Sequence, residues 1–167
     1  IRTLLLAASL LVSAPGLAVA SGKPPAMLQP ALASAGDPDT ARVIQLVSSI
    51  PLAVDLANYD LAEAAFAPSI AIDYTSLWGG SPETMTPAAL MAGWRGIVPG
   101  FDATFHELSG VTASVSGERA VATAHVDGRH WIGDRLWRPI GRYHWELERI
   151  DERWKVTRMV FVMTEEI

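Results

Sequence analysis

The sequence has no cysteine, so disulfide bonds and thiolate metal sites are excluded. Its four histidines form neither an HExxH motif nor a His-x-His pair, and no dedicated metal site is expected. A Gly-x-Ser-x-Gly nucleophile motif is also missing. The glycine pair in Gly79-Gly80-Ser81 is not followed by the lysine that a phosphate-binding loop requires. We therefore expect neither a metal nor a cofactor.

Positive charge is also scarce. The 167 residues contain 13 lysines and arginines against 18 aspartates and glutamates, which gives a net charge of −5. Nucleic acids and anionic membranes would repel such a chain, so neither is expected as a partner. The length fits one domain with a sizeable core.

The N-terminal apolar run is too short to cross a bilayer. Arg2 provides a positive charge before the apolar residues 4–12, and Ala18-Val19-Ala20 is a small-x-small cleavage sequence. These features predict a secretory signal peptide over residues 1–20 and favour it over an uncleaved membrane anchor. The mature protein is therefore expected in the periplasm or outside the cell, without a stable membrane anchor.

The remaining chain divides into a leader and one domain. Residues 21–38 are rich in proline, alanine, glycine and serine without any hydrophobic period, which is typical of a flexible leader. Hydrophobic residues at helical spacing begin after Asp39, so one domain is expected over residues 39–167. Pro51 falls inside this helical pattern and predicts a kink or break near Ile50.

The first part of the domain is predicted to be helical and the last part to be β. A second helix is expected over residues 61–67 with Asp60 as its cap, then a strand over 69–78. Thr86-Pro87 opens a third helix. Four long strands joined by tight turns follow, at residues 103–115, 119–131, 136–149 and 154–163. This order predicts an α+β fold, in which a strongly curved antiparallel sheet wraps over three helices around a cone-shaped pocket.

Four short phrases carry a resemblance to a known family: Ala53-Val54-Asp55, Phe101-Asp102-Ala103-Thr104-Phe105-His106, Gly141-Arg142-Tyr143 and Arg153-Trp154-Lys155-Val156. With the order of elements, they resemble the SnoaL-like branch of the NTF2-like superfamily. The similarity is greatest to the group that holds scytalone dehydratase and hexachlorocyclohexane dehydrochlorinase. It covers about residues 39–165 and implies the NTF2-like cone fold.

The resemblance also implies a catalytic pair. In both enzymes an aspartate on the first helix pairs with a histidine on the strand after the third helix, and the matching positions are Asp55 and His106. A neutral imidazole can remove a proton near pH 7, and a carboxylate on its other nitrogen stabilises the imidazolium. The alternatives are a core histidine bonded to backbone and an aspartate that faces water. The chain departs from the dehydrochlorinase at Ile50-Pro51, where that enzyme has a lysine.

Arg158 is the third catalytic candidate. An arginine in an apolar row is costly to bury unless it is paired, and a substrate oxygen, a leaving group or Asp55 would provide the partner. The alternative is a structural ion pair at the rim of the sheet. By period two, four apolar residues share its face: Trp154, Val156, Val160 and Val162.

His130 is a candidate substrate-binding residue. It shares a strand face with Ala122, Ala124 and Val126, whose small side chains leave room for a ligand. Scytalone dehydratase has a second pocket histidine on the corresponding strand. The alternative, favoured by its place at the strand end, is a solvated histidine at the rim. The two remaining histidines, His125 and His144, fall on the opposite faces of their strands.

Aromatic residues complete the predicted substrate-binding set. Six tryptophans in a small domain suit a flat, apolar ligand, although each aromatic residue also has an explanation as core. By resemblance to the dehydratase, Tyr59 or Tyr74 would donate a hydrogen bond to a carbonyl oxygen. The aromatic candidates are Tyr59, Tyr74, Trp78, Trp94 and Tyr143.

The sequence therefore predicts a cofactor-independent lyase or isomerase that acts on a small apolar molecule through a His–Asp dyad. Two alternatives stay open, a non-catalytic module that binds an apolar ligand and a structural oligomerisation domain. The resemblance also implies a homodimer or homotrimer through the outer face of the sheet, with Arg138, Arg142 and His144 as candidate contacts.

Overall fold

The computed structural model describes residues 36–167. The predicted signal peptide over residues 1–20 and most of the predicted leader lie outside this range. Within it, no helix is both long and apolar enough to cross a membrane.

The first described helix, α2 (Pro38–Asp55), is the longest. It begins one residue before the domain start predicted at Asp39. Asp37 caps it by accepting hydrogen bonds from the backbone amides of Asp39 and Thr40 at 3.2 and 3.1 Å. Pro38 stands in its first turn, where a missing N–H costs nothing. Pro51 was predicted to cause a kink or a break near Ile50, and a break is not found, since the helix continues through Pro51 to its end.

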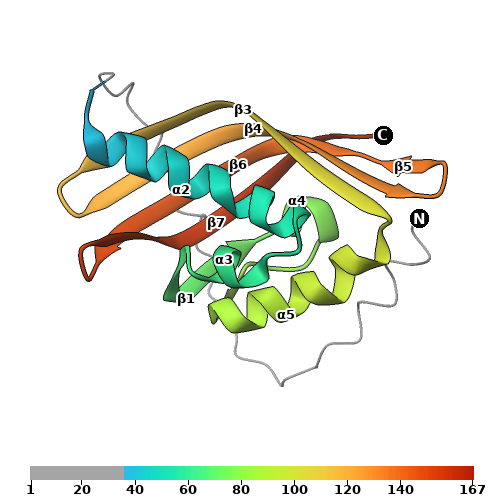
Figure 1. Cartoon of the computed structure of the whole chain (residues 1–167), viewed down its shortest axis with the longest axis horizontal. Coiled ribbons are helices and arrows are strands. Elements are labelled where there is room, and N and C mark those ends of the chain that lie inside the picture. The colour runs from blue at the N-terminus through green and yellow to red at the C-terminus, as the bar shows by residue number, and fades with distance from the viewer. Residues whose placement is uncertain (1–35) are drawn as a thin grey trace.

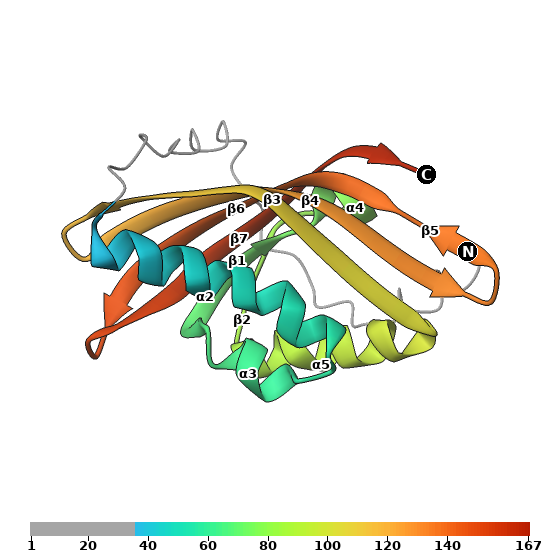
Figure 2. The same cartoon turned by 45° about the horizontal axis from the view of Figure 1, so that its top comes forward.

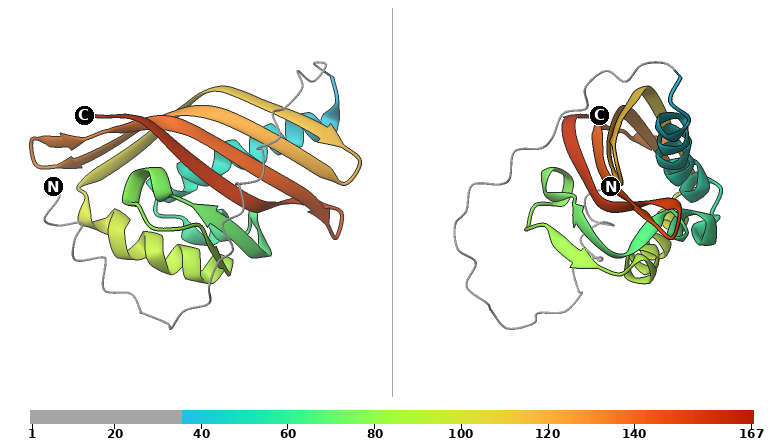
Figure 3. Two further views of the ribbon diagram at one scale, coloured as in Figure 1. Left: turned by 180° about the vertical axis from the view of Figure 1, so that it is seen from behind. Right: turned by 90° about the vertical axis from the view of Figure 1, so that its left-hand side faces the viewer.

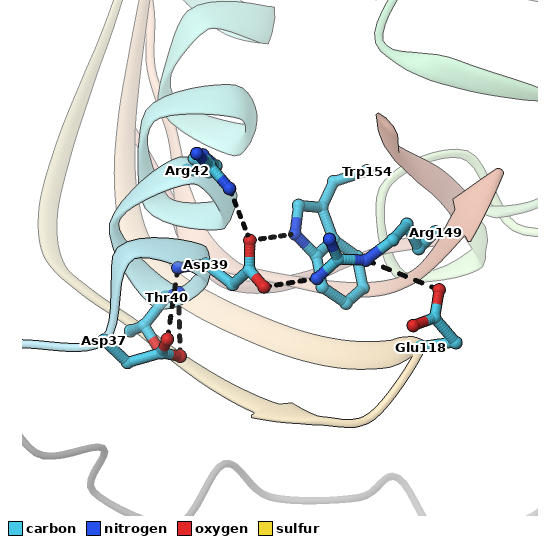
Figure 4. A network of polar contacts seen from close by, with 7 residues as sticks. All are labelled: Asp37, Asp39, Thr40, Arg42, Glu118, Arg149 and Trp154. Atoms are coloured by element: carbon cyan, nitrogen blue, oxygen red, sulfur yellow. Dashed lines mark hydrogen bonds and ion pairs between the residues drawn. The ribbon is translucent and has the colours of Figure 1, made fainter. Parts of the chain in front are cut away.

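An ion-pair network fastens the start of α2 to the sheet (Figure 4). The Asp39 carboxylate accepts hydrogen bonds from Arg149, from Trp154 Nε1 at 3.3 Å and from Arg42 at 3.0 Å. Arg149 also lies 3.4 Å from a carboxylate oxygen of Glu118, in the turn between the first two long strands. The hydrogen bond from Arg149 is the main cause that lowers the pKa of Asp39. One guanidinium thus joins the helix start to two parts of the sheet.

The end of α2 is held by a Schellman motif, which fixes the place of its last residue, Asp55. The Asn58 amide donates to the Ala53 carbonyl at 2.8 Å, and the Ala57 amide donates to Val54 at 3.0 Å. Ala57 has φ +54°, the left-handed conformation for which glycine is the usual residue at this position.

Short elements follow before the long strands, and here the sequence-based assignments need correction. The second helix, α3 (Tyr59–Glu63), is capped by Asn58 rather than Asp60 and ends before the predicted limit. β1 (Phe66–Asp73) is correspondingly earlier than the strand predicted over 69–78. The end of that predicted strand forms a single helical turn, α4 (Thr75–Trp78). A further short strand, β2 (Glu83–Met85), was not predicted.

The rest of the domain follows the predicted order. Thr86 caps α5 (Pro87–Ile97) through its hydroxyl, and the short 3-10 helix η2 (Val98–Gly100) ends the helical part. The strand predicted over 136–149 is divided into two. The strands are β3 (Ala103–Ser116), β4 (Arg119–Ile132), β5 (Arg135–Trp137), β6 (Pro139–Ile150) and β7 (Arg153–Glu166).

All strands join one sheet in the order β2-β1-β7-β6-β4-β3, and β5 pairs with β4. β1 runs parallel to β7, and the other pairs are antiparallel. Figures 1 and 2 show α2 and α5 on the same side of the sheet, and the end-on view of Figure 3 shows the strands curling around them. This is the predicted α+β plan with the helices on the concave face.

Small residues let α2 approach that face closely. Ala120, Ala122 and Ala124 are buried on the inner side of β4, while Val43 and Val47 of α2 are fully buried. Register shifts in β3 and β7 bend the sheet, the first next to Gly110, which has φ +58°. Packing is therefore tight at the start of α2, and the curved sheet opens a space near its end.

Replacement of Ala57 by glycine is expected to stabilise the protein by about 1 kcal/mol, because glycine adopts positive φ without the steric cost of a Cβ. Denaturant unfolding measures the change. Ala41→Gly is the matched control. Ala41 is an exposed alanine inside α2, so glycine there should destabilise by about 1 kcal/mol. If the two glycine substitutions change the free energy of unfolding equally, the C-terminus of α2 is not strained at Ala57.

Candidate active site

A cavity of about 990 Å³ lies between the concave face of the sheet and the helices. Side chains from α2, α4, α5 and the inner faces of β4, β6 and β7 line it. Most are apolar or aromatic, and in the described part of the chain Glu83 is the one aspartate, glutamate, lysine or arginine among the lining residues. Glu83 is exposed, so the interior wall offers a ligand mainly apolar surface.

The Asp55 carboxylate and the His106 ring meet at this wall. His106 Nδ1 lies 2.7 Å from Asp55 Oδ1, and the His106 side chain lines the cavity. The backbone amide of His106 donates to Asp55 Oδ2 at 2.7 Å, and the Thr104 hydroxyl donates to Oδ1 at 2.8 Å. The side chains of Asp55 and His106 are only 8% and 14% exposed.

These contacts decide the charge of Asp55. Burial alone would raise the pKa of its carboxyl group, but the hydrogen bonds from His106 and from the Thr104 hydroxyl, together with the positive charge of His106 when its ring is protonated, outweigh burial and leave the pKa below its ordinary value. Asp55 is therefore a carboxylate at neutral pH, and it accepts a hydrogen bond from the Nδ1–H group of His106. In the neutral imidazole this leaves Nε2 as the nitrogen with the free lone pair, which a general base requires.

The SnoaL-like domain family matches residues 38–160, which is most of the chain. This protein belongs to that family. A comparison with curated proteins finds no match.

Solved structures share the fold. The Kfla4162 protein from Kribbella flavida is 26% identical, with a TM-score of 0.72 over 76% of this chain and 91% of that one. A protein from Novosphingobium aromaticivorans, provisionally named a scytalone dehydratase, is 18% identical, with a TM-score of 0.66 over 76% of this chain and 85% of that one. A Streptomyces avermitilis protein is provisionally named a dehydratase of the NTF2-like family. It is 13% identical with a TM-score of 0.65, and the match covers 76% of this chain and 96% of that one. The predicted NTF2-like cone is therefore the fold of this SnoaL-like domain.

His130 is buried in the SnoaL-like cavity wall and is not a solvated rim residue. Its ring centroid lies 5.0 Å from that of His106, and Phe101 and Trp137 enclose it at 4.9 and 4.7 Å. Burial, followed by the charge of His106, lowers the pKa of His130 to about 4, so it is neutral at pH 7. Gly128 leaves room for the two rings to lie close together, because a Cβ there would be in tight contact with both imidazoles at 3.3 Å.

Four of the five aromatic candidates line the cavity: Tyr74, Trp78, Trp94 and Tyr143. Burial raises the pKa of Tyr143 to about 12, and burial together with Tyr143 raises that of Tyr74. Both hydroxyls therefore stay protonated and can donate hydrogen bonds at neutral pH. Tyr59 is different, because it packs in the core below the Arg95 guanidinium and does not line the cavity.

Arg158 does not line the cavity. The prediction that it lies on the same strand face as Trp154 and Val156 is wrong. The pairing of β6 with β7 shifts at this point, since Glu146 faces Arg158 while Leu147 faces Val156. Thr157 is the extra residue of this bulge, so the period-two pattern changes face after it. Arg158 donates a hydrogen bond to the Glu146 carboxylate at 3.0 Å. It therefore forms a structural ion pair, which was the alternative to a catalytic role.

The candidate contact residues on the outer face also have defined places. Arg138 donates to both carboxylate oxygens of Asp127 at 2.8 and 2.7 Å, and this pairing is the largest cause that lowers the pKa of Asp127 to about 2. Arg142 is exposed and His144 is half-buried. Arg138 is thus held within its own sheet.

Sequence analysis did not select Thr104, Phe101 or Trp137 as site residues. A signal for Thr104 was present, since residues 104 and 106 share one face of a strand. Phe101 and Trp137 stand in a loop and in the short strand β5, where no hydrophobic period could indicate their direction.

His130→Gln is expected to flatten the dependence of stability on pH between about 4 and 6.5. The unfolded chain binds a proton at His130 in this range and the folded protein does not, so the wild type loses about 3 kcal/mol as the pH falls through it. Urea unfolding at several pH values measures the slope. His125→Gln is the control, because His125 is exposed on the outer face of the same strand. Equal slopes for all three proteins would contradict a buried, neutral His130.

Proposed function

We propose that this SnoaL-like domain is a cofactor-independent lyase or isomerase that removes a proton from a small, neutral and largely apolar molecule. The contact of Asp55 with His106 at the wall of an apolar cavity carries the proposal. The fold by itself carries little weight here, because one fold hosts many functions.

His106 is the base in this proposal. Nε2 takes a proton from a carbon next to a carbonyl group, the electron pair of the broken C–H bond moves toward the carbonyl oxygen, and Asp55 stabilises the imidazolium. In an isomerase the proton returns at another carbon. In a lyase the electron pair expels a neighbouring hydroxyl group, which leaves as water after receiving a proton.

Neutral donors stabilise the developing oxyanion. Arg158 is paired outside the cavity, so it is not proposed again for this role. Tyr74 and Tyr143 line the cavity and remain protonated, and hydrogen bonds from such fixed groups are stronger where water is excluded. Within residues 36–167, no lysine or arginine lines the cavity, which favours a neutral substrate over an anionic one.

A non-catalytic binding module is the second candidate. The specific observation in its favour is the cavity wall itself, where aromatic side chains such as Trp78, Phe101 and Trp137 suit a flat, apolar ligand. This module would use His106 for affinity alone.

His106→Gln is expected to lower turnover by about 10²- to 10⁴-fold while ligand binding is retained, because an amide cannot act as the base. A panel of neutral ring ketones, with and without a neighbouring hydroxyl group, is incubated with the protein in D₂O. Mass spectrometry then measures deuterium uptake or loss of water, and calorimetry measures binding.

His125→Gln is the matched control and should leave turnover unchanged. Full turnover by the His106 variant would show that another group is the base. Compounds that bind the wild type without exchange or elimination would favour the binding module.

A further inference from the structure

Thr104 shares the Asp55 oxygen on which the proposed base depends. Its hydroxyl donates to Asp55 Oδ1 at 2.8 Å, and His106 Nδ1 lies 2.7 Å from the same atom. Thr104 and His106 are two residues apart on β3, so their side chains leave the same face of the strand. In the pairing with β4, Thr104 lies opposite His130 and His106 lies opposite Gly128. Thr104 is therefore a neighbour of His106 along its own strand and of His130 across the strand pair.

A nearly buried carboxylate needs such a donor. Asp55 is 8% exposed, and the three donors come from Thr104 and from the amide and ring of His106. Without the hydroxyl, Oδ1 would keep the imidazole alone, and the carboxylate would lose one of the three contacts that fix its plane. Loss of a hydrogen bond to a buried charged group is costly for the charged form.

We propose that Thr104 is a positioning residue, whose hydroxyl holds Asp55 ionised and in line with His106 Nδ1 so that Nε2 remains the basic nitrogen. The inference rests on the proposed function, since it gives Thr104 a role in preparing His106 for proton removal. Thr104 itself does not line the cavity and acts through Asp55.

Thr104→Val tests this role because valine keeps the branched shape and removes the hydroxyl. In protein labelled with ¹³C and ¹⁵N, the Asp55 carboxyl group should titrate about one pH unit higher than in the wild type. The proton on His106 Nδ1 should exchange faster with water, and the ¹⁵N shifts should report a mixture of the two ring tautomers. With a substrate found in the panel, kcat should fall about tenfold with little change in KM. Thr104→Ser, which restores the hydroxyl, should recover all these values.

Thr112→Val is the matched control. Thr112 is on the same strand, and its hydroxyl lies 3.1 Å from that of Thr123, away from the site. This variant loses a threonine hydroxyl from β3 and should leave the signals of Asp55 and His106 unchanged. If Thr104→Val does not fold, Thr104→Ala, which adds no atoms, serves for the same comparison.

Unchanged Asp55 titration and an unchanged His106 tautomer in the folded valine or alanine variant would overturn the proposal, as would the same changes in Thr112→Val. These signals do not require a substrate. Altered signals with no turnover of any compound would retain the positioning role and reject the lyase or isomerase. Unaltered signals in a protein that does turn over substrate would reject the positioning role of Thr104 and retain the lyase or isomerase.

Discussion

The Asp55 carboxylate is the charge that the rest of the structure must accommodate. It is nearly buried, and a buried carboxylate stays ionised only if hydrogen bonds replace its water. All three of its donors come from two residues of β3, Thr104 and His106. The end of α2 must therefore lie against this part of β3, and the same contacts that satisfy the charge also orient the imidazole ring. The Schellman motif that ends α2, with Ala57 in a conformation that glycine adopts more easily, places the carboxylate where these donors can reach it. The end of α2 thus places the Asp55 carboxylate, and the carboxylate in turn orients the His106 ring.

The cavity determines the surroundings of His106, the proposed base. Helices cover one end of a curled sheet, and the enclosed wall is mostly apolar, so polar groups inside it are few and strongly affected by burial. Burial keeps His130 neutral and keeps the hydroxyl groups of Tyr74 and Tyr143 protonated at pH 7. His106 alone among these groups has a carboxylate on its ring, and this difference separates the proposed proton acceptor from its neutral hydrogen-bonding neighbours. Gly128 contributes by its size, because any side chain at this position would press on both imidazoles.

The sequence predicted the parts of this arrangement that depend on regular patterns. Thr86-Pro87 marked the start of α5, and the four long runs of β-forming residues marked the sheet, because caps and periodicity act over a few neighbouring residues. Asp55 and His106 were found from short phrases and their likeness to a family.

The sequence-based predictions were wrong at places where the regular pattern of residues is interrupted. Thr157 adds a residue to β7 and moves Arg158 to the opposite face from the one predicted. Pro51 does not break α2, whose buried residues on both sides of it keep the helix packed. Tyr59 faces the core because α3 is shorter and earlier than its pattern suggested.

The sequence by itself determined the class of the fold, the acidic charge, the exclusion of thiol chemistry and the two residues on which the proposed chemistry depends. The charge and the exclusion of thiol chemistry follow from composition and the class of the fold from hydrophobic period, whereas the two residues follow from the resemblance of short phrases to a family. Only the tertiary structure decided which polar groups share an oxygen, which histidine is deprived of water and which arginine is already paired. Asp55 and Thr104 are 49 residues apart, and Arg158 and Glu146 lie on neighbouring strands. Such contacts depend on strand register and on the place where a helix ends against the sheet, and no local pattern contains either of these.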